Sequence, residues 1–324
     1  MLQVKDLEVT FPDRSRRPIA VVRGLSLTVR GGESLGIVGE SGSGKSVTAL
    51  AVLRLIASPG HISAGSVTLD GVELLSQSER QMRKVRGARI AMVFQDPLTS
   101  LNPTLTVGEQ LIETILAHRR MARRDAHAEA RLWLDRVRIP DSASRMRQYP
   151  SELSGGMRQR VVIAMAFCCH PSVLLADEPT TALDVTVQAQ ILDLMDELKR
   201  ETATAIVLIT HDLAVVAERC DRIAVMYAGQ VVEEGAAVDV FRSPRHPYTR
   251  LLLAAASDVL RPRSRDPLPG LPGLPPDPAR LPPGCPFAPR CPDAAAICRT
   301  APPPIQTFES GQWARCVRAR ELAG

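Results

Sequence analysis

The sequence is poor in aromatic residues and has no long apolar run. Phenylalanine, tryptophan and tyrosine make up only 3% of its 324 residues, whereas hydrophobic residues reach 45% and charged residues 23%, ordinary proportions for a globular protein. The core must therefore be aliphatic. The longest apolar run covers only residues 161–169, well short of the roughly 18 to 20 residues that a bilayer crossing requires. We therefore expect any work at a membrane to be done through a partner.

The first residues also lack the basic segment and apolar stretch of a secretory signal, so we expect a cytoplasmic protein. In a reducing compartment the seven cysteines are poor candidates for a disulfide framework, which leaves buried thiols or metal ligands. The net charge of +5 is mild, and much of the arginine lies in residues 119–147. This pattern favours a solvated helical surface over a face for phospholipid or nucleic acid.

Short apolar runs alternate with helical patterns along most of the chain. Residues 3–39 alternate apolar and polar side chains as strands do, and continuous apolar runs follow at 90–94, 173–176 and 205–209. Between residues 185 and 200 the apolar positions recur with helical spacing. Buried strands alternating with helices predict an α/β fold with a mostly parallel sheet.

Two stretches depart from this alternation. Residues 107–118 and 126–137 are amphipathic helical patterns with no strand between them, which predicts a helical subdomain inserted into the sheet-forming core. Residues 262–304 hold 15 of the 26 prolines, which excludes regular helix and interior strand there. We therefore expect four segments: the first half of the core (1–96), the helical subdomain (97–170), the second half of the core (171–256) and a Pro-rich C-terminal extension (257–324).

The stretch "GESGSGKS", residues 39–46, follows a buried strand and precedes a helical pattern. It matches the phosphate-binding loop G-x-x-x-x-G-K-[S/T], whose glycines let the backbone wrap around phosphates and whose N–H groups face negative charge. We expect Lys45 to reach the β- and γ-phosphates and Ser46 to bind Mg²⁺. The expected nucleotide contacts of this loop are Gly39, Ser41, Gly42, Ser43, Gly44, Lys45, Ser46 and Val47.

Two further apolar strands end in polar residues. The stretch "VLLADE" ends in Asp177 and Glu178, and two carboxylates at the end of a buried strand are costly unless they face a cation. We expect Asp177 to hold Mg²⁺ and Glu178 to be the general base that polarises the attacking water. The strand "AIVLIT" ends at His211, where it can contact the γ-phosphate, although a lone histidine is more often a packing or surface residue.

The stretch "LSGGMRQRV", residues 153–161, opens a helix with a serine and two glycines, a second anion-binding helix start in one chain. With these motifs in this order, residues 1–250 resemble the nucleotide-binding domain of ABC transporters. The resemblance implies a P-loop NTPase (RecA-like) parallel-sheet core with N-terminal antiparallel strands, an ATPase activity, and ATP with Mg²⁺ as the bound nucleotide.

The resemblance also implies further site residues. Ser154, Gly155 and Gly156 would contact the γ-phosphate of ATP held by the other subunit of a dimer. Asp184 would connect the two sites, Gln95 would sense the γ-phosphate and bind Mg²⁺, and Phe11 would stack on adenine. His211 and Lys45 would act beside Glu178 in catalysis.

Finer features, "FQDPLTSLNPTLTVGEQ", "ALDVTVQAQIL" and "SPRHPYTRLLLAA", resemble the ATPase subunits of oligopeptide, dipeptide and nickel importers. This resemblance implies a peripheral protein on the cytoplasmic face of the membrane that drives peptide uptake. Its expected partners are a second, different ATPase subunit in a heterodimer, two permease subunits and an extracytoplasmic solute-binding protein. Residues 95–103 would form the groove for a cytoplasmic coupling helix of the permease, or merely a capped turn.

Four cysteines lie in the extension, at positions 285, 291, 298 and 316. No C-x-x-C pair occurs among them, which weakens a structural zinc site, although four thiolates can also bind an iron–sulfur cluster. The importer resemblance implies a [4Fe–4S] cluster on Cys285, Cys291, Cys298 and Cys316. A Pro-rich segment with few large apolar residues also needs a staple, because burial alone cannot hold it together. Zinc and free thiols stay open as alternatives.

Other functions stay open at this point. An ABC-type ATPase of repair or translation would act on nucleic acid, but the chain has one ATPase unit and no coiled-coil or DNA-binding insertion, so we expect no nucleic-acid partner. An exporter ATPase would normally be fused to membrane helices. Within the importers, nickel chelates and glutathione are alternatives to peptides, because the subunit that hydrolyses ATP does not select the solute.

Overall fold

The computed structural model describes residues 1–181, 183–259 and 273–322. Contacts divide the chain into two compact units. The helical unit comprises Met1, residues 30–33 and residues 76–207, and the sheet unit comprises the described parts of residues 2–29, 34–75 and 208–324. The four segments expected from the sequence are a different partition and stay a prediction.

The sheet unit begins with a four-stranded antiparallel sheet of order β2-β1-β4-β5. In β1 the side chains alternate between buried and more accessible positions, as a strand with one face on the core requires. Leu2 pairs with Val29 of β2 on one side and with Leu69 of β4 on the other. The strands are β1 (Leu2–Pro12), β2 (Pro18–Val29), β4 (His61–Leu69) and β5 (Val72–Glu73).

A second set of strands in this unit has the order β11-β12-β10-β9-β3. β3 runs parallel to β9, and every residue of β3 is buried, which is the continuous apolar pattern of a parallel strand. β9 and β10 form an antiparallel pair. The strands are β3 (Ser34–Val38), β9 (Arg222–Tyr227), β10 (Gln230–Ala236), β11 (Ile305–Thr307) and β12 (Trp313–Arg315). Together these sheets confirm the mixed α/β fold with antiparallel N-terminal strands and a parallel core.

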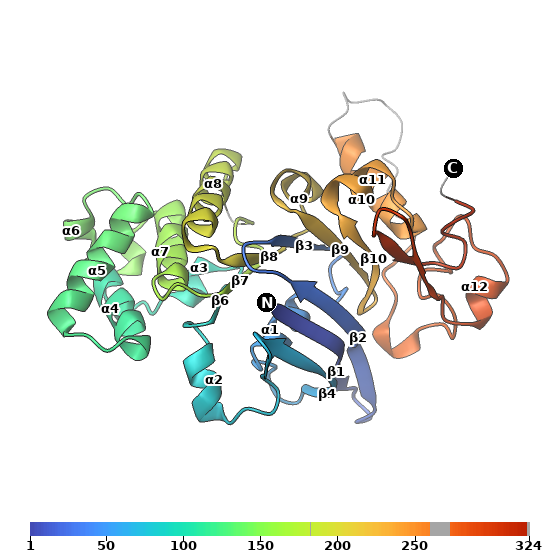
Figure 1. The fold of residues 1–324 in the computed structure, drawn as a ribbon, viewed down its shortest axis with the longest axis horizontal. Coiled ribbons are helices and arrows are strands. Elements are labelled where there is room, and N and C mark those ends of the chain that lie inside the picture. The colour runs from blue at the N-terminus through green and yellow to red at the C-terminus, as the bar shows by residue number, and fades with distance from the viewer. Residues whose placement is uncertain (182, 260–272, 323–324) are drawn as a thin grey trace. The chain divides into compact units, whose positions relative to one another are not determined.

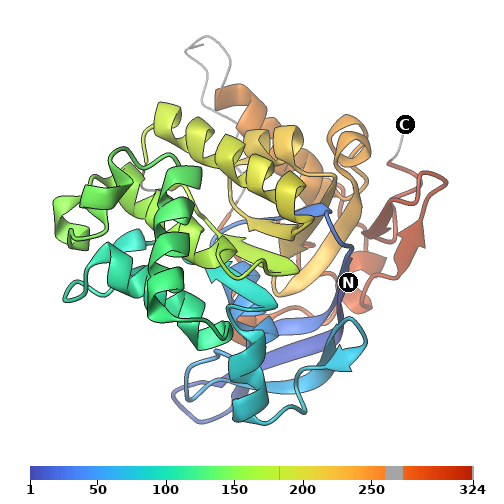
Figure 2. The same ribbon diagram turned by 60° about the vertical axis from the view of Figure 1, so that its left-hand side comes forward.

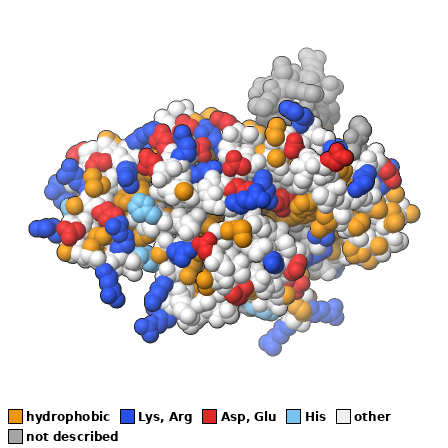
Figure 3. Space-filling model, viewed as in Figure 1, with side chains coloured by type: hydrophobic (Ala, Val, Ile, Leu, Met, Phe, Trp, Pro, Cys, Tyr) orange, Lys and Arg blue, Asp and Glu red, His pale blue; other side chains and the backbone are white. Residues whose placement is uncertain are grey.

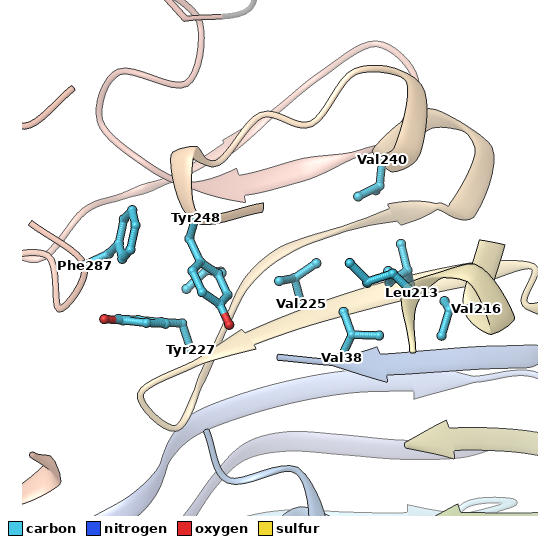
Figure 4. Packing of buried hydrophobic residues seen from close by; sticks show 10 residues of the cluster. Val38, Leu213, Val216, Val225, Tyr227, Val240, Tyr248 and Phe287 are labelled. Carbon is cyan, nitrogen blue, oxygen red and sulfur yellow. The ribbon is translucent and has the colours of Figure 1, made fainter. Parts of the chain in front are cut away.

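Helices α9, α10 and α11 cover a buried cluster beside β3 and β9 (Figure 4). Valine and leucine side chains fill one end, and the other end holds Tyr227, Tyr248 and Phe287. Phe287 comes from the C-terminal extension, so the extension contributes to the core of this unit. The helices are α1 (Lys45–Val52), α9 (Leu213–Arg219), α10 (Ala237–Arg242) and α11 (Pro247–Val259).

The described part of the extension is irregular. Between residues 273 and 304 it forms only η2 (Pro278–Arg280) and the single-turn helix α12 (Ile297–Thr300), as its prolines predict. Beyond the prolines, β12 pairs with β10 and β11 pairs with β12 (Figure 1). The extension therefore adds two short strands to the edge of β10.

The helical unit contains the parallel pair β6 (Ile90–Val93) and β7 (Val173–Asp177). Helices α4, α5 and α7 pack on one another, with Trp133 buried (Figure 2, green to yellow-green). The predicted helices 107–118 and 126–137 are confirmed as α4 and the greater part of α5. The helices are α2 (Glu79–Val85), α3 (Pro97–Ser100), α4 (Val107–His118), α5 (Arg123–Arg136), α6 (Ser142–Arg145), η1 (Pro150–Glu152), α7 (Gly155–Phe167) and α8 (Val185–Thr202).

The boundary between the two units falls inside β8 (Ala205–Ile209), all of whose residues are buried. Among the residues with described positions, no helix has both the length and the apolar character needed to cross a bilayer. On the face in Figure 3, Lys and Arg side chains are interspersed with Asp and Glu where Figure 1 places α4 to α6. This mixture fits the solvated surface expected for the arginine-rich stretch.

Candidate nucleotide-binding site

In the sheet unit, residues 39–46 connect β3 to α1 as the phosphate-loop pattern requires. Gly39 adopts φ of 152°, and a Cβ there would lie 2.2 Å from the carbonyl oxygen of Met226, so only glycine fits. Gly42 and Gly44 also have positive φ. Helix α1 has no side-chain cap at its first turn, which leaves a start of the kind that binds anions.

Polar groups inside the loop suit a phosphate ligand. Lys45 is buried, and its Nζ donates to the carbonyl oxygens of Gly39 at 2.7 Å and Glu40 at 3.0 Å, so the ammonium lies within the loop. The Oγ of Ser43 is buried and makes no hydrogen bond with the described residues. A buried hydroxyl without a partner is costly, and a phosphate oxygen would satisfy it. The loop therefore fits ATP.

In the helical unit, two predicted catalytic residues meet. Val93 pairs with Ala176 in the β6–β7 ladder, so the residues that follow each strand emerge at the same sheet edge. There the Nε2 of Gln95 donates to Oε2 of Glu178 at 2.9 Å, and the hydroxyl of Thr181 donates to the same oxygen at 2.9 Å. These two donors hold the Glu178 carboxylate in one orientation.

Glu178 is also conformationally unusual. Its φ is 46°, in the left-handed region that a side chain other than glycine seldom adopts, and such strain concentrates at functional sites. Asp177, the last residue of β7, is buried. A buried carboxylate beside a hydrogen-bonded one is a set of hard oxygen donors that suits Mg²⁺.

Residues 153–161, called the signature from here on, lead into α7. The Oγ of Ser154 accepts a hydrogen bond from the backbone N–H of Met157 at 3.3 Å, and Gly155 and Gly156 form the first turn. A Cβ on Gly156 would lie 2.9 Å from Cγ1 of Val187, so the glycine also allows α8 to approach closely. Asp184 caps α8 by accepting from the N–H of Val187 at 2.9 Å.

Two predicted contacts lie elsewhere in the sheet unit. His211 follows β8 and is exposed. Phe11 is half-buried near the end of β1, and its ring lies against Gly60, where an added Cβ would lie only 2.3 Å from Cε1. The roles of both residues stay predictions.

Sequence reasoning missed the partners of Glu40. The backbone N–H of Glu40 donates to the hydroxyl of Tyr248 at 2.9 Å, and its carboxylate is paired with Arg290. Arg290 follows Glu40 by 250 positions, so no local pattern could have indicated the pair. Tyr248 lies in the stretch of residues 243–255, which indicated a family resemblance but no contact with Glu40.

The prediction of an iron–sulfur cluster is wrong on this evidence. Among the residues the structure describes, no group of three or more His, Cys, Asp or Glu side chains is arranged to hold a metal ion, which also counts against zinc. None of the seven cysteines is part of a disulfide. Burial raises the pKa of Cys291 and of Cys316 to about 11. The extension is held instead by the packing of Phe287 and the pairing of β12.

Comparisons with known proteins agree with this geometry. The family model described as "ABC transporter" matches residues 22–181, and the model "Oligopeptide/dipeptide transporter, C-terminal region" matches residues 232–298. The chain is 51% identical over 323 residues to the oligopeptide transport ATP-binding protein OppD of Escherichia coli, covering 99% of this chain and 94% of that protein. It is 50% identical to the probable peptide ABC transporter ATP-binding protein y4tR of Sinorhizobium fredii, covering 99% and 96%.

Among solved structures, the chain is similar to the ATP-binding cassette MJ0796, described as a dimeric post-hydrolysis state bound to ADP and Pi. The TM-score is 0.65 at 29% sequence identity, and the match covers 73% of this chain and 99% of the cassette. A second match is cbiO1 from Clostridium perfringens, part of the transporter complex cbiONQ, with a TM-score of 0.63 at 26% identity over 74% of this chain and 90% of that chain.

These comparisons also correct the expected heterodimer. The matched cassette is described as a dimer of MJ0796, and the curated relatives are described only as ATP-binding proteins, so nothing in these comparisons supports pairing with a different ATPase subunit. The phosphate loop, the signature and the nearly full-length similarity agree with one another. The chain belongs to the ATP-binding proteins of the ABC transporter family, in the oligopeptide and dipeptide transporter group.

Proposed function

We propose that this protein hydrolyses ATP to drive the import of peptides through a membrane permease. The relatives named for oligopeptide transport and peptide import support the cargo class, because similarity to them extends over nearly the whole chain. The observation that carries the ATPase part is the Glu178 carboxylate, held at the end of β7 by Gln95 and Thr181. The protein would work peripherally at the cytoplasmic face of the membrane, with permease subunits and a solute-binding protein as partners.

Each site residue has a proposed role. Lys45 binds the β- and γ-phosphates, and the loop N–H groups bind the remaining phosphate oxygens, as in other phosphate loops. Ser46, Gln95 and Asp177 would hold Mg²⁺, which supplies positive charge to the phosphates when bound. Glu178 orients and deprotonates the attacking water, His211 contacts the γ-phosphate, and Phe11 stacks on adenine.

Two cassettes are proposed to close over ATP. Ser154, Gly155 and Gly156 would bind the γ-phosphate held by the phosphate loop of the other cassette, using the Ser154 hydroxyl and the N–H groups of the first turn of α7. Asp184 would connect the two sites. Residues 95–103 include the short helix α3, whose start is capped by Asp96, and would receive a coupling helix of the permease. Because Gln95 belongs to this segment, contact with the permease would move a group that touches Glu178.

Replacing Glu178 with glutamine tests the proposal. The amide keeps an oxygen that accepts from Gln95 and Thr181, but it cannot take a proton, so we expect hydrolysis to fall by about 10² to 10⁴-fold while ATP affinity stays within about twofold. Phosphate release and nucleotide binding are measured with the transporter complex. Uptake of a radiolabelled tripeptide is measured in cells that carry the variant or the wild type.

The matched control is Glu201→Gln, which changes an exposed carboxylate at the end of α8. It should leave hydrolysis and uptake unchanged. Normal hydrolysis by the Glu178→Gln complex would refute the role of Glu178. Wild-type cells that accumulate nickel or glutathione but no peptide would refute the cargo and leave the ATPase assignment standing.

A further inference from the structure

A buried ion pair connects the C-terminal extension to the phosphate loop. Arg290 donates from Nη1 to Oε2 of Glu40 at 2.7 Å and from Nη2 to Oε1 at 2.9 Å, so the guanidinium and carboxylate meet in the two-point geometry that arginine favours. The Arg290 side chain is 6% exposed and that of Glu40 is 18% exposed. Both residues lie in the sheet unit, and Glu40 is the second residue of the loop.

Three aromatic rings pack beside Arg290 and hold its side chain in place. The rings of Tyr227, Tyr248 and Phe287 pack with centroids 4.6 to 5.4 Å apart (Figure 4). Nη1 of Arg290 also donates to the hydroxyl of Tyr227 at 3.2 Å, and its guanidinium lies 5.8 Å from the centroid of that ring. Because Phe287 and Arg290 belong to one turn of the extension, burial of the aromatic ring also holds the guanidinium in place.

The same cluster reaches the loop backbone. The hydroxyl of Tyr248 accepts the N–H of Glu40, while the carbonyl of Glu40 accepts from Lys45. The Glu40 side chain, N–H and carbonyl are therefore all held. Prolines 275, 276 and 278 of the extension line a cavity together with Glu40, Ser41, Gly42 and Ser43, so the extension also lies beside the loop.

The pairing with Arg290 reduces the repulsion between the Glu40 carboxylate and bound phosphates. ATP brings several negative charges to a loop that already contains Glu40, and unit charges of the same sign repel strongly when they are partly buried. A bidentate arginine neutralises the carboxylate and fixes its direction. Removing one member of a buried pair leaves the other charge uncompensated, which is costly.

We propose that Arg290 is a positioning residue for ATP binding: it neutralises and orients Glu40, so that the C-terminal extension sets the affinity of the phosphate loop. The proposal rests on the proposed ATPase function. It gives the extension a role at the nucleotide, where the family resemblance had implied a metal cluster.

The experiment measures binding of ATP to the full-length protein by equilibrium dialysis. Arg290→Met keeps the apolar stem but leaves Glu40 unpaired, so we expect roughly 10- to 30-fold weaker binding. Glu40→Gln leaves the charge of Arg290 uncompensated and should bind ATP several-fold more tightly. In the double variant neither charge remains, so affinity should return to within about threefold of the wild type, which a merely structural role for Arg290 would not produce.

Arg299→Met is the matched control, since Arg299 is exposed in the same extension, and it should bind ATP like the wild type. Unchanged affinity in Arg290→Met, or no recovery in the double variant, overturns the proposal. If Arg290→Met does not fold, Glu40→Gln decides, because equal or weaker binding by that variant overturns it. Absence of ATP binding by the wild type would instead refute the proposed function.

Discussion

At the residue scale, the junction between β10 and the extension depends on buried polar groups. The Glu233 carboxylate accepts the backbone N–H groups of Arg245 at 2.6 Å and His246 at 2.8 Å, and the side-chain amide of Gln312 at 2.6 Å. Burial raises its pKa, although these donors act in the opposite direction. Because these donors come from the loop before α11 and from the extension, one carboxylate of β10 organises the contact of three segments.

His246, beside Glu233, makes folding sensitive to acid. Burial and the positive charge of Arg250 lower its pKa to about 3, so the folded state keeps it neutral. In the unfolded chain this histidine takes up a proton near pH 6.5, whereas in the folded chain it does not. The folded state therefore keeps its full stability above pH 6.5 and loses stability as the pH falls below that value. We expect a loss of about 1.4 kcal/mol per pH unit below pH 6.5 from His246 alone.

His246→Asn tests this dependence. Nδ1 of His246 accepts the N–H of Tyr248 at 3.0 Å, and an asparagine side chain can accept the same bond without titrating. We expect the variant to lose about 1 to 3 kcal/mol at neutral pH from lost packing but to show a smaller fall toward pH 5. Urea unfolding of the full chain, followed by circular dichroism, gives both values.

His127→Asn is the control, because His127 is exposed. Its stability should show the full pH dependence of the wild type. Glu233 opposes His246, because a raised carboxyl pKa stabilises the folded state at low pH and the benefit disappears as the pH rises through the folded value. An acid-induced fall of the same size in wild type and His246→Asn would contradict the assignment to His246.

At the scale of an element, α7 has two functions that can be separated. Ser154 caps the helix, and we propose that it also binds the γ-phosphate. Ser154→Ala should lower the free energy of unfolding by about 1 kcal/mol, the usual value of a cap, yet lower ATP turnover more than tenfold. Thermal unfolding and phosphate release by the transporter complex give the two numbers.

Thr106→Ala is its matched control, because Thr106 caps α4 with a comparable bond of 3.3 Å to the N–H of Glu109. It should lose similar stability and keep normal turnover. Equal effects of the two substitutions on turnover would mean that Ser154 acts only as a cap.

Elements with local signals could be predicted closely from the sequence. α4 spans the predicted residues 107–118, because Thr106 and Glu109 form a capping box at its start. α5 begins at Arg123, three residues before the predicted start, since Arg123, Arg124 and Asp125 carry no apolar periodicity. The contact of Gln95 with Glu178 was not predicted, but the structure explains it, because β6 and β7 end at one edge of a parallel ladder.

Elements without local signals could not be predicted. β12 has three residues, and it forms because Glu233 and Glu234 of β10 offer backbone partners some 80 residues away. The pair of Glu40 and Arg290 likewise depends on tertiary packing. The family resemblance implied a cluster on four cysteines, but neither the resemblance nor the cysteine spacing determines how the side chains are arranged, which is why that prediction was wrong.

At the scale of the whole molecule, the chain combines a transporter cassette with an extension. The two family models match separate stretches, and the solved cassette matches 73% of the chain, leaving about a quarter outside the match. Where Figure 1 places α12, hydrophobic side chains gather on the surface of Figure 3. The extension's own buried cluster is small, consisting of Ala314, Cys316 and Ala319, so most of its stability must come from its contacts with the cassette.

Removal of residues 301–324 tests this dependence. The deletion unpairs β10 from β12, takes Gln312 from Glu233, and removes the buried Ala314 and Ala319. We expect the free energy of unfolding to fall by about 3 kcal/mol or more, since a buried carboxylate loses a donor and an apolar contact is lost. The exposed edge of β10 should also promote association, visible as higher mass in light scattering.

The control is deletion of only residues 321–324, which keeps β12 and should change neither the stability nor the mass. Equal stability of the longer deletion and the wild type would show that the extension is merely attached to the cassette.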